Sequence, residues 1–256
     1  MLRNIANGLI ALYLLPFKIS PKVFYYVKGV FFTSGTEHLY WATRYIKRHT
    51  NIPADSIVID VGGFDGATSL YFAREFPNQK VHCFEPNARM WTALDQIEAA
   101  HPQIIVRKLA LGREKGEAVL HVTANDVSSS LNEISSEETE RTPLEFQASM
   151  REEAQAKVPV STLDDEFRDS RDILLMKLDT QGLELEILRS GLETLKKTRF
   201  ILTEMDNHQL YKNACQYYEV DEFMRQHSFK LVDIVVSYRG DDGMAEYDAL
   251  YQNVGI

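Results

Sequence analysis

The chain has little cysteine and no run of apolar residues long enough to span a membrane. Cys83 and Cys215 are the two cysteines among 256 residues. Two cysteines cannot build a disulfide framework or a zinc cluster, so we expect buried thiols in a reducing, cytoplasmic compartment. The apolar run 9–15 is too short to cross a bilayer, and Pro16 interrupts it. No small-residue cleavage site follows that run, which argues against a secretory signal.

Acidic residues are absent before Glu37. Four basic residues therefore give residues 1–36 a charge of +4 within a chain of net charge −9: Arg3, Lys18, Lys22 and Lys28. Acidic chains are seldom general nucleic-acid binders, so we expect no nucleic-acid partner. Residues 1–50 are predicted to form a helical arm. The arm either packs on the main domain or rests on an anionic membrane, and the charge bias favours a weak peripheral membrane contact through residues 1–36.

What is present is the composition of a folded domain. Hydrophobic residues make up 45% and charged residues 25% of the chain. These values are typical of soluble globular proteins and exclude a disordered, collagen-like or polytopic membrane protein. The length allows one large domain, or one domain with an appendage.

From Asn51 onward, short apolar runs alternate with segments of helical periodicity. Strands are expected near 56–60, 80–85, 103–108, 173–179 and 200–205. Helices are expected near 67–76, 88–100, 182–195 and 217–227. Alternation of this kind predicts an α/β domain over 51–256, with a parallel sheet covered by helices on both faces. Residues 230–237 and 245–253 are predicted to form a terminal antiparallel pair.

The stretch 117–165 breaks this alternation and is predicted to be an insertion over the sheet. Residues 117–123 alternate like an exposed strand, and the charged stretch 137–157 is predicted to be helical. Residues 158–163 are predicted to form an edge strand, because Pro159 has no N–H to donate to a central ladder.

The most informative local pattern is Asp60-Val-Gly-Gly-Phe-Asp-Gly66, where a strand enters a glycine loop that opens a helix. Glycine lets the backbone adopt positive φ and approach a ligand closely. A dinucleotide site needs glycines at relative positions 1, 3 and 6, and this loop lacks that spacing. Its carboxylates would also repel a pyrophosphate, whereas the cationic methionine end of S-adenosylmethionine tolerates them. The loop thus predicts S-adenosylmethionine, with cofactor contacts from four residues: Asp60, Gly62, Gly63 and Asp65.

Acidic residues stand at the ends of four predicted strands: Asp60, Glu85, Asp179 and Glu204. Sheets of this type bind ligands outside the carboxyl ends of their strands, so we expect at least two of these acids to line one site. Glu85 follows the second strand, where an acid can accept both ribose hydroxyls of an adenosine.

The chain resembles the FkbM-like S-adenosylmethionine-dependent methyltransferases over about residues 55–253. The segments that carry the resemblance occur in the order found in that family: 60–66, 84–87, 158–164, 177–184 and 201–204. The resemblance implies a class I methyltransferase (Rossmann-like) fold, with seven strands and the last strand antiparallel. It also implies methyl transfer, usually to an oxygen of a sugar, a glycan or a secondary metabolite.

Residue by residue, the match includes the loop, the ribose side and the later motifs: Asp60, Gly62, Gly66, Glu85, Pro86, Asn87, Thr162, Leu163, Asp164, Lys177, Asp179, Gly182, Glu184 and Glu204. The resemblance thus adds Asn87 to the predicted cofactor residues. Residues 129–131 resemble a Ser-Ser-Leu turn that lies near the cofactor in the family. The chain departs from the family at Gly63-Phe64-Asp65, and at Thr180 and Gln181, where the family usually has Val and Glu.

Transfer to an alcohol requires a base for the hydroxyl proton, in addition to in-line positioning. Asp179, Glu204 and His208 are the predicted catalytic candidates, and Lys177 is expected to pair with Asp179 or Glu204. The spacing of His, Asp and Glu predicts no metal site. Two alternatives stay open, a non-catalytic Rossmann-like binding module and a nicotinamide-dependent oxidoreductase.

Overall fold

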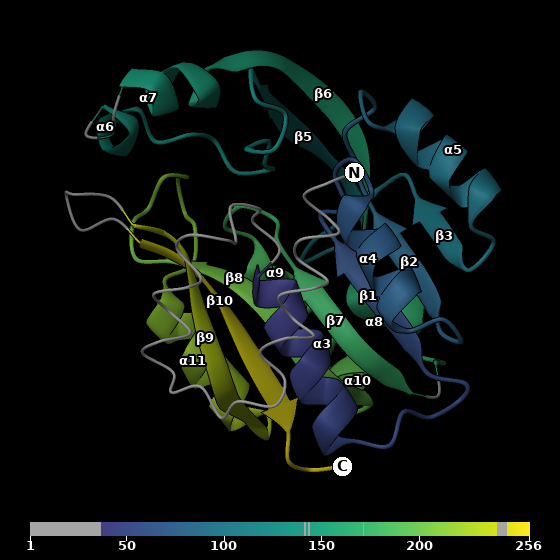
Figure 1. The fold of residues 1–256 in the computed structure, drawn as a ribbon. Helices are drawn as coiled ribbons and strands as arrows, with labels where there is room; N and C mark the ends of the chain where they lie inside the picture. The colour runs from purple at the N-terminus through teal and green to yellow at the C-terminus, as the bar shows by residue number, and fades with distance from the viewer. Residues whose placement is uncertain (1–36, 141, 143, 171, 240–244) are drawn as a thin grey trace, which may run out of the picture.

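The computed structural model describes residues 37–140, 142, 144–170, 172–239 and 245–256 (Figure 1). Residues 1–36 of the predicted arm, and the membrane contact expected through them, lie outside the described residues. The strands are β1 (Ile57–Val61), β2 (Lys80–Phe84), β3 (Ile104–Arg107), β4 (Ala110–Leu111), β5 (Gly116–Thr123), β6 (Glu152–Ser161), β7 (Ile173–Leu178), β8 (Thr198–Asp206), β9 (Phe229–Arg239) and β10 (Ala245–Asn253). The helices are α3 (Glu37–His49), α4 (Ala67–Glu75), α5 (Trp91–Ala100), α6 (Ser136–Thr139), α7 (Leu144–Met150), α8 (Leu163–Phe167), α9 (Glu184–Arg189), α10 (Leu192–Leu195) and α11 (Tyr217–Gln226).

The main sheet has seven strands in the order β3-β2-β1-β7-β8-β10-β9. Neighbours from β3 to β8 pair in parallel, whereas β10 is antiparallel to both β8 and β9. This arrangement confirms the predicted Rossmann-like methyltransferase fold with an antiparallel last strand. The carboxyl ends of β1, β2, β7 and β8 therefore meet along one edge of the sheet.

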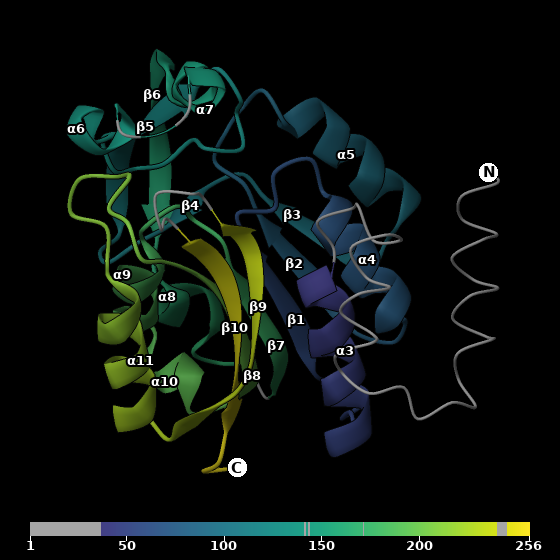
Figure 2. The ribbon, with the colours of Figure 1, turned by 60° about the vertical axis from the view of Figure 1, so that its left-hand side comes forward.

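Alternating side chains on the strands build two hydrophobic cores, one on each face of the sheet. Val58 and Leu175 face the core shared with α3, α4 and α5, whereas Ile59 and Met176 face the core shared with α8 to α11. Figure 2 shows the two groups of helices on opposite sides of the sheet. Successive residues of a strand point to opposite faces, so strands buried on both sides must be apolar throughout. Strand β7 follows this rule with one exception, because all six of its residues are buried and only Lys177 is not apolar.

Helix α3, which falls within the predicted arm, packs on the sheet. Leu39, Ala42 and Ile46 recur at helical spacing and join the core beside α4. At its start, His38 Nδ1 lies 3.4 Å from the Asp248 carboxylate of β10. The beginning of α3 is thereby held beside a central strand.

The predicted insertion contains α6 and α7 and supplies β5 and β6 to a second sheet of three strands, in the order β4-β6-β5. Strand β4 precedes the insertion in the chain. Figure 1 shows this small sheet standing beyond the main sheet, at the end opposite the C-terminus. The edge-strand prediction for 158–163 is wrong, because β6 lies between its two partners. Strand β4 pairs with Val160 and Ser161 and stops short of Pro159, so the missing N–H leaves no gap in that ladder.

Two helical predictions also need correction. Residues 152–157, predicted to be helical, belong to β6, because their backbone pairs with β5 from Val119 to Thr123. The single helix predicted over 182–195 is divided into α9 and α10 at Ser190 and Gly191. A Cβ at Gly191 would lie 2.5 Å from the Leu163 Cβ, so close packing on α8 requires glycine there.

Among the described residues, no helix combines the length and apolar character that crossing a membrane would require.

Candidate functional site

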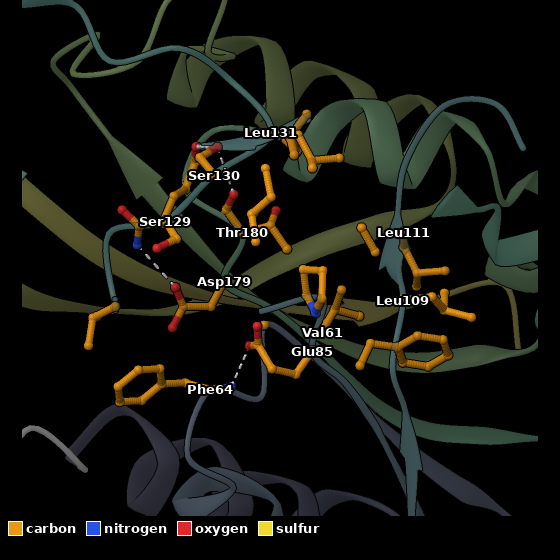
Figure 3. Close-up of a pocket in the computed structure, with 18 of the residues that line it drawn as sticks. Val61, Phe64, Glu85, Leu109, Leu111, Ser129, Ser130, Leu131, Asp179 and Thr180 are labelled. Carbon is orange, nitrogen blue, oxygen red and sulfur yellow. Dashed lines mark hydrogen bonds between the residues drawn. The ribbon is translucent and has the colours of Figure 1, made fainter. Parts of the chain in front are cut away.

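A cleft lies between the carboxyl edge of the main sheet and the insertion. Residues from the β1, β2 and β7 ends form its floor, and residues 126–131 of the insertion form its opposite wall (Figure 3). At least two of the four acids at the strand ends were predicted to line one site, and Glu85 and Asp179 both line this cleft.

The glycine loop after β1 brings backbone to the floor of the cleft. Gly62 has a φ of +81°, and a Cβ there would lie 1.8 Å from the Asp179 carbonyl oxygen. Gly63 serves packing, because its Cβ would lie 2.2 Å from the Cys83 sulfur and the residue does not line the cleft. Asp65 is exposed, and its carboxylate accepts a hydrogen bond from the Ala67 N–H at the start of α4. Of the predicted loop contacts, only Gly62 therefore lies in the cleft.

Asp60 lies behind the cleft rather than in it. The side chain is fully buried, and its Oδ2 accepts a hydrogen bond of 2.6 Å from the Ser69 hydroxyl. Its Oδ1 has no hydrogen-bond partner among the described residues. Burial raises the pKa of Asp60 to about 6, although the charge of Lys177 on the neighbouring strand opposes the rise.

Glu85 stands in the middle of the cleft floor. Its Oε2 accepts a hydrogen bond of 2.8 Å from the Phe64 N–H, and its Oε1 accepts one of 2.7 Å from the Asn87 N–H. Each oxygen keeps a further lone pair for a ligand. Burial raises the pKa of Glu85 to about 7, despite the two backbone hydrogen bonds.

The two ends of the cleft differ in polarity, as Figure 3 shows around Glu85. One end is apolar and is lined by four leucines, which are Leu109 before β4, Leu111 of β4, and Leu120 and Leu131 of the insertion. The other end is polar and contains Asp179, Thr180 and Gln181 together with the backbone of Gly62. The cleft can therefore take a ligand with a flat apolar group, a hydroxylated centre and a cationic end.

The insertion is tied to the cleft floor by hydrogen bonds. Asn87 does not itself line the cleft, but its Nδ2 donates to the Asp126 carboxylate at 3.0 Å. The Ser130 hydroxyl donates to the Gln181 carbonyl at 2.9 Å. Residues 129–131 thus lie at the cleft, where the resemblance to the family placed them.

The turn that follows β7 is held in shape by the Glu184 carboxylate. Its Oε1 accepts hydrogen bonds from the Thr180 N–H and hydroxyl at 2.8 and 2.9 Å, and its Oε2 accepts one from the Gly182 N–H at 3.1 Å. Gln181 within this turn has a φ of +60°. Phe64 and Asp126, with φ of +46° and +41°, also line the cleft. Left-handed non-glycine residues are uncommon and concentrate at functional sites.

Asp179 projects into the polar end of the cleft and is paired with a buried cation. The Lys177 ammonium donates a hydrogen bond of 2.6 Å to Asp179 Oδ2. Of the two partners predicted for Lys177, Asp179 and Glu204, this is the first. Burial alone would raise the pKa of Asp179, but the charge and hydrogen bond of Lys177 outweigh it and lower that pKa. Asp179 is therefore favoured in its ionised form, whereas burial favours the protonated form of Glu85.

Further carboxyl groups gather beside Asp179. Glu204 does not line the cleft, and burial together with the Asp179 charge raises its pKa well above the ordinary range. Burial raises the pKa of Asp206 to about 8, and it also raises the pKa of Glu246. Asp179 is thus the ionised member of a carboxyl cluster whose other members tend to hold protons.

The structure does not bring His208 to the cleft. Its Nδ1 lies 3.8 Å from the Glu138 carboxylate of α6, and the side chain is absent from the cleft lining. The sequence reasoning in turn missed Tyr211, whose hydroxyl lies 2.9 Å from Gln181 Oε1. No local pattern marks Tyr211, because it reaches the site through an irregular connection between β8 and α11. Over the described part of the chain, no cluster of three or more His, Cys, Asp or Glu side chains is arranged to hold a metal ion.

Comparison with known families places these features in context. The family described as the methyltransferase FkbM domain matches residues 60–231, which include the glycine loop, Glu85 and the turn after β7. A solved structure of an FkbM methyltransferase from Methylobacillus flagellatus shares the fold, with a TM-score of 0.50 and 12% identity. That similarity covers 80% of this chain and 45% of the other chain.

Two curated relatives are similar in sequence. The 2-O-methyltransferase NoeI of Sinorhizobium fredii is 27% identical over 161 residues, which are 62% of this chain and 66% of the relative. Methyltransferase 1 of Beauveria bassiana is 25% identical over 149 residues, which are 54% of this chain and 59% of the relative. The matched segments thus span less than two thirds of the length of either relative.

Proposed function

Since this chain belongs to the FkbM methyltransferase family, we propose that it transfers a methyl group from S-adenosylmethionine to a hydroxyl oxygen of a small-molecule acceptor. The family is dependent on S-adenosylmethionine, which agrees with the cofactor that the glycine loop predicted. The observation that carries the proposal is the presence of Glu85 and Asp179 in one cleft, with the apolar end on the far side of Glu85.

The cleft residues fit the cofactor part by part. Leu109 and Leu111 offer an apolar slot for the adenine ring. Each Glu85 oxygen accepts one backbone N–H and keeps a lone pair for a ribose hydroxyl. Gly62 lets the backbone approach the methionine end, and the polar lining at that end of the cleft suits its charged groups. When bound, S-adenosylmethionine supplies an electrophilic methyl group on a positively charged sulfur.

Asp179 is the base that the geometry favours. It lines the cleft, whereas Glu204 and His208 do not. Its lowered pKa keeps it ionised near neutral pH, so it can take the proton of the acceptor hydroxyl as the oxygen attacks. Lys177 holds the carboxylate in place through its hydrogen bond of 2.6 Å. The insertion wall, from Asp126 to Leu131, faces this end and would contact the acceptor.

An oxygen acceptor, such as a sugar or glycan hydroxyl, is supported by the relative named as a 2-O-methyltransferase. Calorimetry with S-adenosylmethionine and with NADH tests the cofactor, and release of S-adenosylhomocysteine over a panel of sugar acceptors tests the reaction. We expect binding of S-adenosylmethionine alone. Binding of NADH in its place would favour the oxidoreductase, and cofactor binding without turnover on any acceptor would favour a binding module.

Asp179→Asn tests the assignment of the base. The change keeps the shape of the side chain and removes its charge, so turnover should fall by about 10²–10⁴ while the dissociation constant for S-adenosylmethionine changes little. Asp95→Asn, on the exposed face of α5, is the matched control and should leave both values unchanged. A loss of cofactor binding without a loss of turnover at saturation would assign Asp179 to cofactor binding instead.

We further propose weak peripheral membrane contact through residues 1–36. The support is the sequence alone, namely four basic side chains without an acid on an otherwise acidic chain. Each basic residue near an anionic surface adds about 1 kcal/mol of attraction. The full chain should co-sediment with anionic vesicles at low salt, and a variant that lacks 1–36 should stay in the supernatant. A full chain that stays in the supernatant would contradict the proposal.

A further inference from the structure

Gln181 occupies the position where this chain departs from its family, and its side chain lies between two carboxyl groups. Its Nε2 is 2.7 Å from Glu204 Oε2 and 3.3 Å from Asp179 Oδ1. One amide nitrogen carries two hydrogens, so Gln181 can donate to both groups at once. A glutamate at 181 would bring a third carboxyl group to the same place.

The opposite side of the Gln181 amide contacts Tyr211, which comes from the connection between β8 and α11 and is itself in contact with the insertion. The Tyr211 hydroxyl lies 2.9 Å from Gln181 Oε1 and 2.8 Å from the Ser128 carbonyl oxygen. Tyr211 is only 1% exposed and packs with Met150 of α7. The single hydroxyl hydrogen of Tyr211 can be donated to only one of these oxygens at a time. With Oε1 beside this hydroxyl, the amide nitrogen faces the two carboxyl groups.

We propose that Gln181 is a positioning residue that holds the Asp179 carboxylate in the cleft, and that Tyr211 sets its orientation from the insertion side. This inference rests on the proposed function, in which Asp179 is the base. Through Tyr211 and Gln181, the wall that faces the acceptor is linked to the carboxylate that takes the proton. Because the amide is neutral, it stabilises the ionised carboxylate without adding charge to the cluster.

The electrostatic surroundings explain why a neutral donor matters here. One buried cation, Lys177, faces Asp179, while acids approach it from every neighbouring element: Asp60 of β1, Glu85 after β2, Glu184 of α9, Glu204 and Asp206 of β8, and Glu246 and Asp248 of β10. Like charges favour protonation of one another, and a hydrogen bond to the charged form opposes it. Loss of the amide donor should therefore favour the protonated form of Asp179.

The test measures the titration of Asp179 directly, in cofactor-free protein with carbon-13-labelled aspartate. Asp179→Asn identifies the signal. Gln181→Leu removes the donor and Gln181→Glu replaces it with an acid, so both should raise the Asp179 midpoint by about one pH unit or more, a tenfold change in its acid dissociation constant. Tyr211→Phe removes one hydroxyl and should raise the midpoint by a smaller amount. Gln209→Glu adds a charge at an exposed neighbour whose amide donates to the Ala214 carbonyl, and should leave it unchanged.

Activity supplies a second readout. In the Gln181 variants the acidic limb of the turnover profile should move with the titration midpoint, while the dissociation constant for S-adenosylmethionine stays within about threefold because the base does not hold the cofactor. An unchanged Asp179 midpoint in folded Gln181→Leu would overturn the inference. If Gln181→Leu does not fold, Tyr211→Phe decides in the same way. Because the titration needs neither cofactor nor acceptor, a failure of methyl transfer alone would count against the proposed function and not against this role of Gln181.

Discussion

Single residues at this site work through the proton state of buried carboxyl groups. Glu85 shows this most simply, because burial raises its pKa to about 7 while its remaining lone pairs face the cleft. Ribose hydroxyls are donors, so they bind the ionised form better than the protonated form. Cofactor binding should therefore release a proton near neutral pH.

We predict that the affinity for S-adenosylmethionine increases as the pH rises from 6 to 8. Replacement by Gln keeps the size of Glu85 and removes its titration, so Glu85→Gln should bind the cofactor about tenfold more weakly at pH 8 and lose the pH dependence that Glu85 contributes. Calorimetry at several pH values, in buffers with different ionisation enthalpies, measures both the affinity and the proton release. A pH dependence that persists unchanged in Glu85→Gln would assign it to another group.

At this scale the sequence predicted where acids would meet but not what each would do. Parallel strands end at one edge, and this geometry places Glu85 and Asp179 in the cleft. Whether an acid at a strand end lines the cleft also depends on the face of the sheet to which its side chain points. The Asp60 side chain points into the core, beside Ser69. Tyr211 could not be predicted, since it lies 30 residues from Gln181 and reaches it through an irregular loop.

At the scale of elements, the β1–α4 loop and the residue that follows β7 approach each other closely at the floor of the cleft. A Cβ at Gly62 would lie 1.8 Å from the Asp179 carbonyl oxygen, and φ is +81°. Both strain and steric overlap would therefore penalise any other residue. Because Gly62 has no side chain, the floor of the site between β1 and β7 is formed by backbone atoms.

We predict that Gly62→Ala lowers the free energy of unfolding by about 2 kcal/mol or more, through left-handed strain and displacement of the turn. Urea denaturation at fixed pH measures this change, and calorimetry should show weakened cofactor binding in the fraction that folds. Gly116→Ala is the matched control, since no heavy atom lies within 4 Å of its Cβ position. Its effect should stay within about 0.5 kcal/mol. Equal effects of the two changes would contradict the steric argument.

The elements that sequence reasoning placed correctly are those buried on both faces, because a run such as Ile173–Leu178 is apolar at every position except Lys177. The insertion was harder to predict for a physical reason. Residues 152–157 contain Glu, Ala, Gln and Lys, which favour helices, yet pairing with β5 makes them a strand. Tertiary contacts override local propensity of this kind, and the charge of these residues reflects their exposure and not their backbone.

At the scale of the whole molecule, the buried acids affect folding as well as the site. Burial raises the pKa of Asp60 to about 6, of Glu85 to about 7 and of Asp206 to about 8. In the unfolded chain these groups lose their protons at lower pH. Between those pH values the folded state binds more protons, so its stability falls as the pH rises. Burial lowers the pKa of His82 to about 4, and this group has the opposite effect up to about pH 6.5.

We predict that the melting temperature of the cofactor-free protein decreases from pH 6.5 to pH 8.5. In that window His82 is neutral in the folded state, and in the unfolded chain it loses its remaining proton at the low end, so the three raised acids dominate. Calorimetric melting across the range measures the slope. Asp206→Asn, which removes one titration with little change of shape, should flatten it. A melting temperature that rises across this window would contradict the prediction.

The insertion occupies one uninterrupted stretch of chain, from β5 to β6, although it forms a whole wall of the cleft. Every other part of the cleft comes from segments before Gly112 or after Ser161. The hydrogen bonds between the two parts come from a limited set of insertion residues: Asp126, Ser128, Ser130, Asn132, Glu133, Ser135, Glu153, Val160 and Ser161. The gene segment for 116–161 is thus a natural unit for exchange between relatives. A chimera that keeps those contact residues should inherit the donor's acceptor preference while retaining its own cofactor affinity.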